Sequence, residues 1–222
     1  MDFGLFLSEK DPIISDKTMV KKTPQPLDKQ ILSRFYGAGR GSVFHPNAFL
    51  HLGRRPAIDK ALSRLVAKGR IRRLARGLYE YPKVHPLLHE LAPNPDVVAK
   101  ALAGKLGARL QPSGAYAANL LGLSEQVPAK IVFLTDGPSK TVEIGKQQIQ
   151  LKTTTPKNMQ TAGRISGVVI QALRYLGKEH IDEQIIKILK QRLGPTDKKQ
   201  LIEDINLAPS WIAARIRDIA GE

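Results

Sequence analysis

RRPAIDKALSRLVAKGRIRRLARGLYEYP, residues 54–82, is the stretch whose pattern decides the fold of the N-terminal part of the chain. Its first half predicts a helix from about Pro56 to Lys68, because proline suits the first turn of a helix and Gly69 ends it. One apolar stripe recurs there at helical spacing, formed by Ile58, Leu62, Leu65 and Val66. The helix therefore has one face to bury and other faces left for polar side chains.

The second half of the stretch predicts a β-hairpin. Ile71–Leu74 and Leu78–Pro82 are short strand candidates, and the tight turn Ala75-Arg76-Gly77 joins them. Arg76 stands at the tip of this hairpin. In a hairpin that lies against DNA, a tip arginine can touch backbone phosphate or the minor groove.

Upstream residues complete the pattern. Leu27–Tyr36 predicts a first helix, Ser42–Phe44 a short strand, and Pro46–His51 a short second helix. Helix, strand, helix, helix, strand, turn and strand follow one another in the order of a winged helix-turn-helix. The glycines of Gly37–Gly41 follow a helix rather than a strand, which excludes a dinucleotide-binding turn.

The distribution of charge indicates a polyanionic partner for this segment. The 222 residues carry a formal net charge of +15, and residues 27–82 hold twelve lysines and arginines against only Asp28, Asp59 and Glu80. A concentrated positive field attracts nucleic acid, whose phosphates supply most of the non-specific affinity. Residues 1–26 are balanced in charge and rich in proline, which predicts a flexible N-terminal arm.

The predicted third helix and the hairpin together present the candidate DNA contacts. An arginine can bond guanine through two hydrogen bonds, and a serine can bond several bases. The predicted contact residues are Arg54, Arg55, Lys60, Ser63, Arg64, Arg72, Arg73 and Arg76. Two other interpretations stay open: a winged helix that contacts only protein, and an ordinary α+β domain with a solvated basic face.

Residues 83–222 predict a second, mixed α+β domain with a small sheet and C-terminal helices. Its strands are expected at Ile131–Thr135, Thr141–Ile144 and Gln148–Thr154. Residues 164–176 and the stretches after 181, 196 and 209 predict helices. These C-terminal helices are expected to pack on the small sheet, with a partner-binding face as the alternative.

Three local features of this domain are expected to be structural. His85–Glu90 is interpreted as a linker rather than a metal site, since Pro86 separates the histidines and the glutamate follows the second one. Ser113 is expected to cap a helix that runs to Leu120, and Thr196 to cap a later helix.

The sequence offers no catalytic site, metal site or cofactor site. Cysteine is absent, Asp182 and Glu183 face different directions on a helix, and the spacing of Glu143 to Lys146 misses a nuclease-type acid-x-Lys pair by one residue. No apolar run is long enough to span a bilayer, and Met1–Leu7 lacks the features of a signal peptide. A non-enzymatic, cytoplasmic protein without a membrane partner is expected.

Several motifs in order resemble one bacterial family. They are Tyr36-Gly37-x-Gly39-Arg40-Gly41-x-Val43-Phe44, the helix segment Ala61–Leu65, the hairpin Arg72–Tyr79, the run Leu110–Leu123, and Val127–Lys130. Together they resemble the AbiEi antitoxins of type IV toxin–antitoxin systems, which act in abortive infection and phage defence. The resemblance covers about Leu27 to Ile205. It implies an N-terminal winged helix that represses its own operon by binding operator DNA, and a C-terminal domain that counters a nucleotidyltransferase toxin.

Two other functions compete with this expectation. The first is a stand-alone winged-helix transcriptional regulator without a toxin partner. The second is an enzyme that acts on nucleic acid, which only the basic charge supports. A nucleotidyltransferase reading frame beside this one would favour the antitoxin.

Overall fold

The opening stretch folds as helix and hairpin at nearly the predicted bounds. A computed structural model of the chain describes residues 25–104 and 108–221, where α2 spans Arg55–Ala67, β2 spans Arg72–Ala75 and β3 spans Leu78–Glu80. Before them come α1 (Leu27–Ala38), β1 (Val43–Phe44) and the 3-10 helix η1 (Pro46–Phe49). The order agrees with the prediction, but η1 is a single 3-10 turn and α1 runs two residues past Tyr36.

The strands of this N-terminal part form a three-stranded antiparallel sheet in the order β1-β3-β2. Side chains along a strand alternate between faces, so Tyr79 and Leu78 point to opposite sides. Tyr79 joins the core beneath α1 and α2, whose centre includes Phe35 and Leu62. Leu78 instead packs into a second core together with Val43. The small sheet therefore has apolar contacts on both faces.

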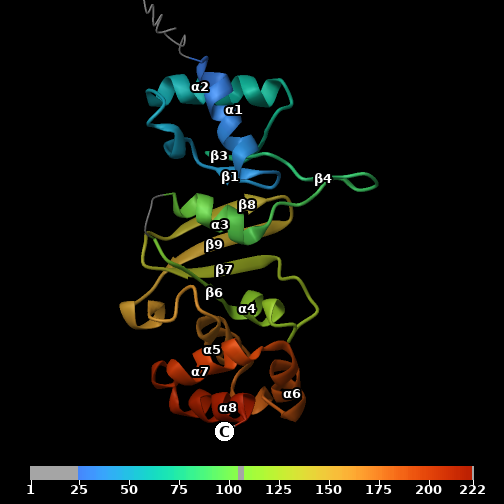
Figure 1. Ribbon diagram of the computed structural model, residues 1–222, viewed down its shortest axis with the longest axis vertical. Helices are drawn as coiled ribbons and strands as arrows, with labels where there is room; N and C mark the ends of the chain where they lie inside the picture. The colour runs from blue at the N-terminus through green and yellow to red at the C-terminus, as the bar shows by residue number, and fades with distance from the viewer. Residues whose placement is uncertain (1–24, 105–107, 222) are drawn as a thin grey trace, which may run out of the picture.

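The segment expected to be a linker forms a projecting hairpin. β4 (Val84–His85) pairs antiparallel with β5 (His89–Glu90), and the hairpin stands out to the right of the body in Figure 1. His85 shapes its turn, since Nδ1 accepts hydrogen bonds from the backbone N–H groups of Leu87 and Leu88 at 3.2 and 3.3 Å. Leu87 and Leu88 themselves are exposed. The histidine pair is thus part of a turn.

A second sheet of four strands forms the middle of the molecule. Its strands are β6 (Leu110–Ser113), β7 (Lys130–Thr135), β8 (Lys140–Ile144) and β9 (Gln147–Thr153), in the order β6-β7-β9-β8. β7 and β9 run parallel, and the other neighbours run antiparallel. Figure 1 shows α3 (Pro95–Ala103) between this sheet and the N-terminal elements, and α4 (Gly114–Leu120) on the opposite side.

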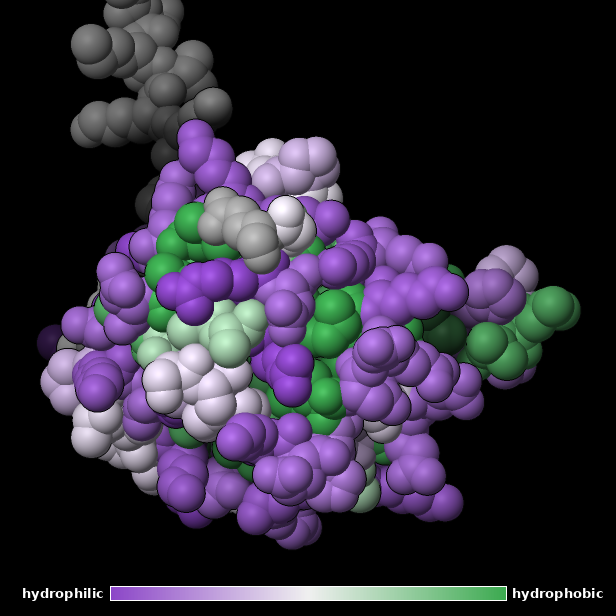
Figure 2. Space-filling model, turned by 90° about the horizontal axis from the view of Figure 1, so that it is seen from below, coloured by the Kyte–Doolittle hydropathy of each residue, from purple (hydrophilic) through white to green (hydrophobic). Residues whose placement is uncertain are grey.

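Four further helices close the C-terminal end around their own apolar core. They are α5 (Ile165–Leu176), α6 (Glu183–Arg192), α7 (Pro195–Glu203) and α8 (Ser210–Ala220), with short 3-10 turns at Pro156–Met159 (η2), Lys178–His180 (η3) and Ile205–Leu207 (η4). Figure 2 views this end of the molecule, where polar surface predominates and apolar patches interrupt it. These helices pack on one another and on α4, and α5 also contacts β6 of the sheet, while the partner-binding face stays a prediction.

Two predicted helix caps differ in the structure. Ser113 is the N-cap residue of α4, but its hydroxyl donates to Oε1 of Gln171 at 3.2 Å rather than capping the helix. Thr196 lies inside the first turn of α7, whose N-cap is Gly194. The carboxylate of Asp197 accepts the Gly194 N–H at 3.1 Å, and no side chain at the N-cap position accepts a bond from the first turn.

One apolar cluster joins residues on both sides of Pro82. Val43 and Leu78 belong to the same apolar cluster as Val98 of α3 and as Ile131 and Phe133 of β7. The boundaries at residues 26 and 82 stay predictions, and residues 1–24 of the expected arm lie outside the described residues. Among the helices of the described ranges, none combines the length and apolarity needed to cross a bilayer.

Candidate nucleic-acid interface

The predicted contact residues of α2 lie on its exposed side. Ile58, Ala61, Leu62 and Leu65 are buried, which leaves Lys60, Ser63 and Arg64 on the solvent-facing surface. Arg54 is the N-cap residue and Arg55 the first residue of the helix, and both side chains are exposed. The amphipathic pattern thus presents a polar face that begins with two arginines.

The three acids of residues 27–82 each form an ion pair with one of the predicted arginines. Asp28 pairs with Arg64, Asp59 with Arg55, and Glu80 with Arg72. The three pairs differ in burial and in the number of arginine donors that they occupy. These differences decide which arginines keep donors for a ligand.

The Arg72 side chain is tied to the protein interior. Nε donates to Glu80 at 2.6 Å, Nη1 to Glu90 at 2.9 Å, and Nη2 to the backbone oxygen of Leu91 at 2.6 Å. The Glu80 side chain is 1% exposed. Burial raises the pKa of Glu80 above its usual value, and Arg72 opposes that shift. Arg72 therefore fastens β2 to β3 and to the projecting hairpin through bonds from all three of its nitrogens.

Arg64 is held against α1 near the end of α2. Its Nε and Nη2 donate to the two carboxylate oxygens of Asp28 at 3.0 and 2.5 Å, a bidentate pair between the helices. The hydrogen bond from Arg64 lowers the pKa of Asp28. The Arg64 side chain remains 53% exposed, so it keeps outward donors while linking α1 to α2.

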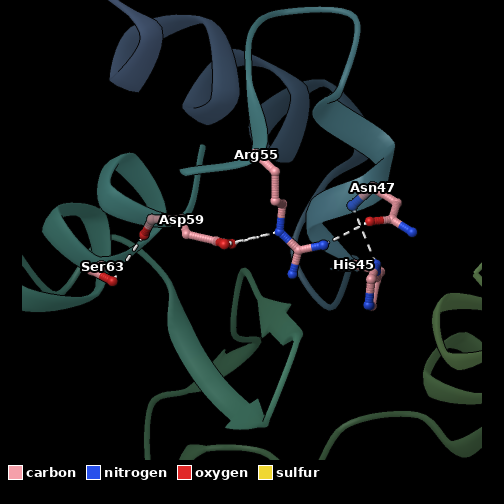
Figure 3. Close-up of polar contacts among 5 residues, drawn as sticks. All are labelled: His45, Asn47, Arg55, Asp59 and Ser63. Atoms are coloured by element: carbon pink, nitrogen blue, oxygen red, sulfur yellow. Dashed lines mark hydrogen bonds and ion pairs between the residues drawn. The ribbon is translucent and has the colours of Figure 1, made fainter. Parts of the chain in front are cut away.

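Arg55 lies between two polar partners from different elements. Its Nε donates to both oxygens of Asp59 at 2.9 Å, and its Nη1 donates to Oδ1 of Asn47 at 2.8 Å. Figure 3 shows the guanidinium between these two side chains. Nδ1 of His45, the N-cap of η1, accepts the backbone N–H of Asn47 at 3.2 Å. This network connects the start of α2 to η1.

Other predicted contacts are exposed without an acidic partner. Within the described part of the chain, Arg54, Lys60 and Arg76 form no ion pair. Arg73 is exposed too, and its Nε donates only to the oxygen of Ala75, at 3.4 Å. These four cations can bind phosphate without first giving up a carboxylate.

The hairpin turn lies beside the start of the η1 network. Gly77, which follows Arg76 in the turn, has φ +75°, and a Cβ at this position would lie 3.2 Å from Nε2 of His45. Glycine therefore suits this turn both for its backbone angle and for the close approach of the ring. Because His45 also holds Asn47, the hairpin tip and the Arg55 network belong to the same region of the surface.

Ser63 turns its hydroxyl toward its own helix. Oγ donates to the backbone oxygen of Asp59 at 2.9 Å (Figure 3). A serine that bonds back in this way keeps its oxygen lone pairs for an incoming donor. Ser63 is therefore placed to accept a hydrogen bond from the outer face of α2.

Asp136, in the turn after β7, is paired with an arginine. Asp136 accepts the Arg109 backbone N–H through Oδ1 and the Arg109 Nε through Oδ2, both at 2.8 Å. These bonds lower the pKa of Asp136. Asp136 thus joins the turn after β7 to the start of β6.

The stability of the chain is expected to fall relative to the variant His45→Asn as pH falls through about 6.5. Burial, followed by the nearby Arg55, lowers the pKa of His45 below 6.5. The unfolded chain therefore takes up the proton at a higher pH than the folded chain, which favours unfolding in that window. Asparagine can cap η1 without titrating. Urea unfolding of both proteins between about pH 7.5 and 5 measures the difference, and parallel pH profiles would contradict the assignment.

The chain was compared with known protein families. A family model described as "Family of unknown function (DUF6088)" matches residues 30–201, which is most of the chain. No protein of curated function matches it. The resemblance to the AbiEi antitoxins accordingly stays a prediction from the motifs.

Proposed function

The chain belongs to the DUF6088 family, whose function is unknown, and we propose that it is a DNA-binding transcriptional autorepressor and the antitoxin of a type IV toxin–antitoxin system. In this proposal the N-terminal elements are a winged helix-turn-helix that binds the operator of its own operon. The C-terminal part counters a nucleotidyltransferase toxin.

The observation that carries the DNA-binding half is the arrangement of α2 beside the β2–β3 hairpin. α2 buries one apolar face and exposes a basic one, and the hairpin tip with Arg76 lies near the network at the start of α2. In a winged helix, this helix enters the major groove and the hairpin touches the adjacent backbone. The net positive charge of residues 27–82 supplies the attraction to phosphate.

The proposed contact set is narrower than the predicted one. Arg54, Lys60, Arg73 and Arg76 bind phosphate or base edges, and Arg55, Ser63 and Arg64 contribute their remaining donors and acceptors. Arg72 is left out, because all three of its nitrogens already donate within the protein and its side chain is only 26% exposed.

The antitoxin half is supported by the motif resemblance. The run Leu110–Leu123, which carries much of it, forms β6, α4 and the turn after α4, and this segment joins the four-stranded sheet to the C-terminal helices. The segment therefore contributes apolar side chains to both layers. The contact with a toxin, and the residues that would make it, are not assigned.

Two cellular assays test the two halves separately. A reporter behind the DNA upstream of this reading frame is expected to be repressed by the chain and released by the variant Arg54→Ala/Lys60→Ala/Arg76→Ala. Co-expression with a neighbouring nucleotidyltransferase is expected to restore growth. Repression without rescue of growth would support a stand-alone regulator, and rescue without repression would place the function outside DNA binding.

A further inference from the structure

Asp59 is an acidic residue on the surface proposed to bind DNA, where its negative charge does not attract phosphate. Asp59 lies on α2 among basic residues, and its side chain is 46% exposed. A carboxylate on such a face repels phosphate and lowers the affinity for any DNA. Its position needs a reason other than attraction to the ligand.

The geometry supplies that reason through Arg55. Asp59 accepts Nε and Asn47 accepts Nη1, so one partner from α2 and one from η1 fix the plane of the guanidinium. The Arg55 side chain is nevertheless 43% exposed. An arginine held on two sides loses less rotational freedom when it binds, because that freedom has already been restricted.

The remaining donors of Arg55 match guanine. A guanidinium has five N–H groups. The bonds to Asp59 and Asn47 occupy one on Nε and one on Nη1, so each terminal nitrogen keeps an N–H with no acceptor among the described residues. Two adjacent donors are what the O6 and N7 atoms of guanine accept in the major groove.

Arg55 and Arg64 differ in their positions along α2. Arg55 is the first residue of α2, and the N-terminal residues of a recognition helix are the ones that reach base edges. Arg64 lies near the other end and is held by a single residue, Asp28. On these grounds Arg55 is assigned to a base and Arg64 to the helix–helix contact and backbone.

We infer that Arg55 is a pre-oriented guanine reader, and that Asp59 and Asn47 are the positioning residues that hold its guanidinium for this task. The inference rests on the proposed DNA-binding function and adds its base preference. The competing explanation is an ordinary surface pair at i,i+4, which stabilises the helix only slightly and has no effect on base choice.

The test is selection of duplexes from a randomised DNA library by the full-length chain and its variants. The wild-type chain is expected to select a site with guanine at one fixed position. Asp59→Ala is expected to lose at least about fivefold of that preference, while its affinity for unselected DNA stays equal or rises. Arg55→Lys is expected to keep general affinity and lose the preference, since lysine is a point charge.

Asp28→Ala is the matched control. It removes the same charge from the neighbouring helix α1 and frees Arg64, so it is expected to raise general affinity and leave the guanine preference intact. Circular dichroism confirms that each variant is folded. If Asp59→Ala and Arg55→Lys keep the full guanine preference, the inference is wrong although DNA binding survives. If no duplex is selected by the wild-type chain, the proposed function itself fails.

Discussion

Replacement of Arg72 by methionine is expected to destabilise the chain by about 3 kcal/mol, the lower end of the range for breaking a buried ion pair. Methionine keeps the length and the apolar stem of arginine but removes every donor. Glu80, 1% exposed in the sheet, would then lack its cation. Urea unfolding at neutral pH measures the loss as a shift of the midpoint.

Two further proteins make this expectation specific. Glu80→Gln in the Arg72→Met background removes the buried charge and is expected to recover much of the lost stability. Arg73→Met changes the neighbouring exposed arginine and is expected to have little effect. A loss for Arg72→Met no larger than that for Arg73→Met would show that the buried pair does not fasten the sheet.

The pH dependence of Arg72→Met follows from the same pair. Burial already raises the pKa of Glu80, and loss of Arg72 removes a group that lowers it. A carboxyl whose folded pKa lies above its unfolded value stabilises the fold as pH falls through the folded pKa. The deficit of Arg72→Met relative to wild type is therefore expected to shrink between neutral pH and about pH 5.

Simultaneous replacement of Arg54, Lys60 and Arg76 by alanine is expected to weaken DNA binding about 100-fold, at roughly 1 kcal/mol or more for each contact. These residues form no ion pair among the described residues, so their removal leaves no buried charge. Stability should change little. The dependence of log K on log salt is expected to fall by about 0.9 for each lost phosphate contact. Fluorescence anisotropy over a series of salt concentrations measures both quantities.

A variant with the same change of charge is the control for this experiment. Lys187, Lys190 and Lys199 are exposed on α6 and α7, at the end of the molecule opposite α2 in Figure 1. Their replacement by alanine is expected to change affinity by less than about threefold, because charges beyond about 8 Å are largely screened at physiological salt. Equal losses in the two triple variants would mean that net charge alone governs binding.

The helices and strands were largely predictable because their patterns are local. Apolar spacing and the glycine and proline signals placed α2, β2 and β3 within one or two residues. The short 3-10 turn η1 and the cap of α7 were not predicted correctly. Both involve side-chain hydrogen bonds, those accepted by His45 and Asp197, which periodicity does not register.

The candidate site was predictable as a surface but not residue by residue. Strand alternation places Arg72 and Arg73 on opposite faces of β2, with Arg73 opposite Tyr79 and Arg72 opposite Glu80. The pattern therefore indicated that the two arginines have different surroundings. The i,i+4 spacing of Arg55 and Asp59 was visible too. Asn47 left no signal, because it comes from another element and meets Arg55 only in the folded chain.

Contacts across the predicted domain boundary could not be predicted from the sequence either. Leu78 has the pattern of an ordinary hairpin residue, yet it belongs to the same apolar cluster as Phe133, 55 positions away in the chain. Such pairings depend on how two elements dock, and local patterns carry no information on docking.

The most direct measurement is the affinity of the full-length wild-type chain for a duplex from the region upstream of its own reading frame. It is measured by anisotropy at about 150 mM salt, against a shuffled duplex of equal composition as competitor. The wild-type chain is expected to prefer the upstream duplex by at least about 1,000-fold, and Arg54→Ala/Lys60→Ala/Arg76→Ala is expected to lose affinity. Equal affinity for both duplexes, or binding that this variant leaves unchanged, would contradict the proposed function.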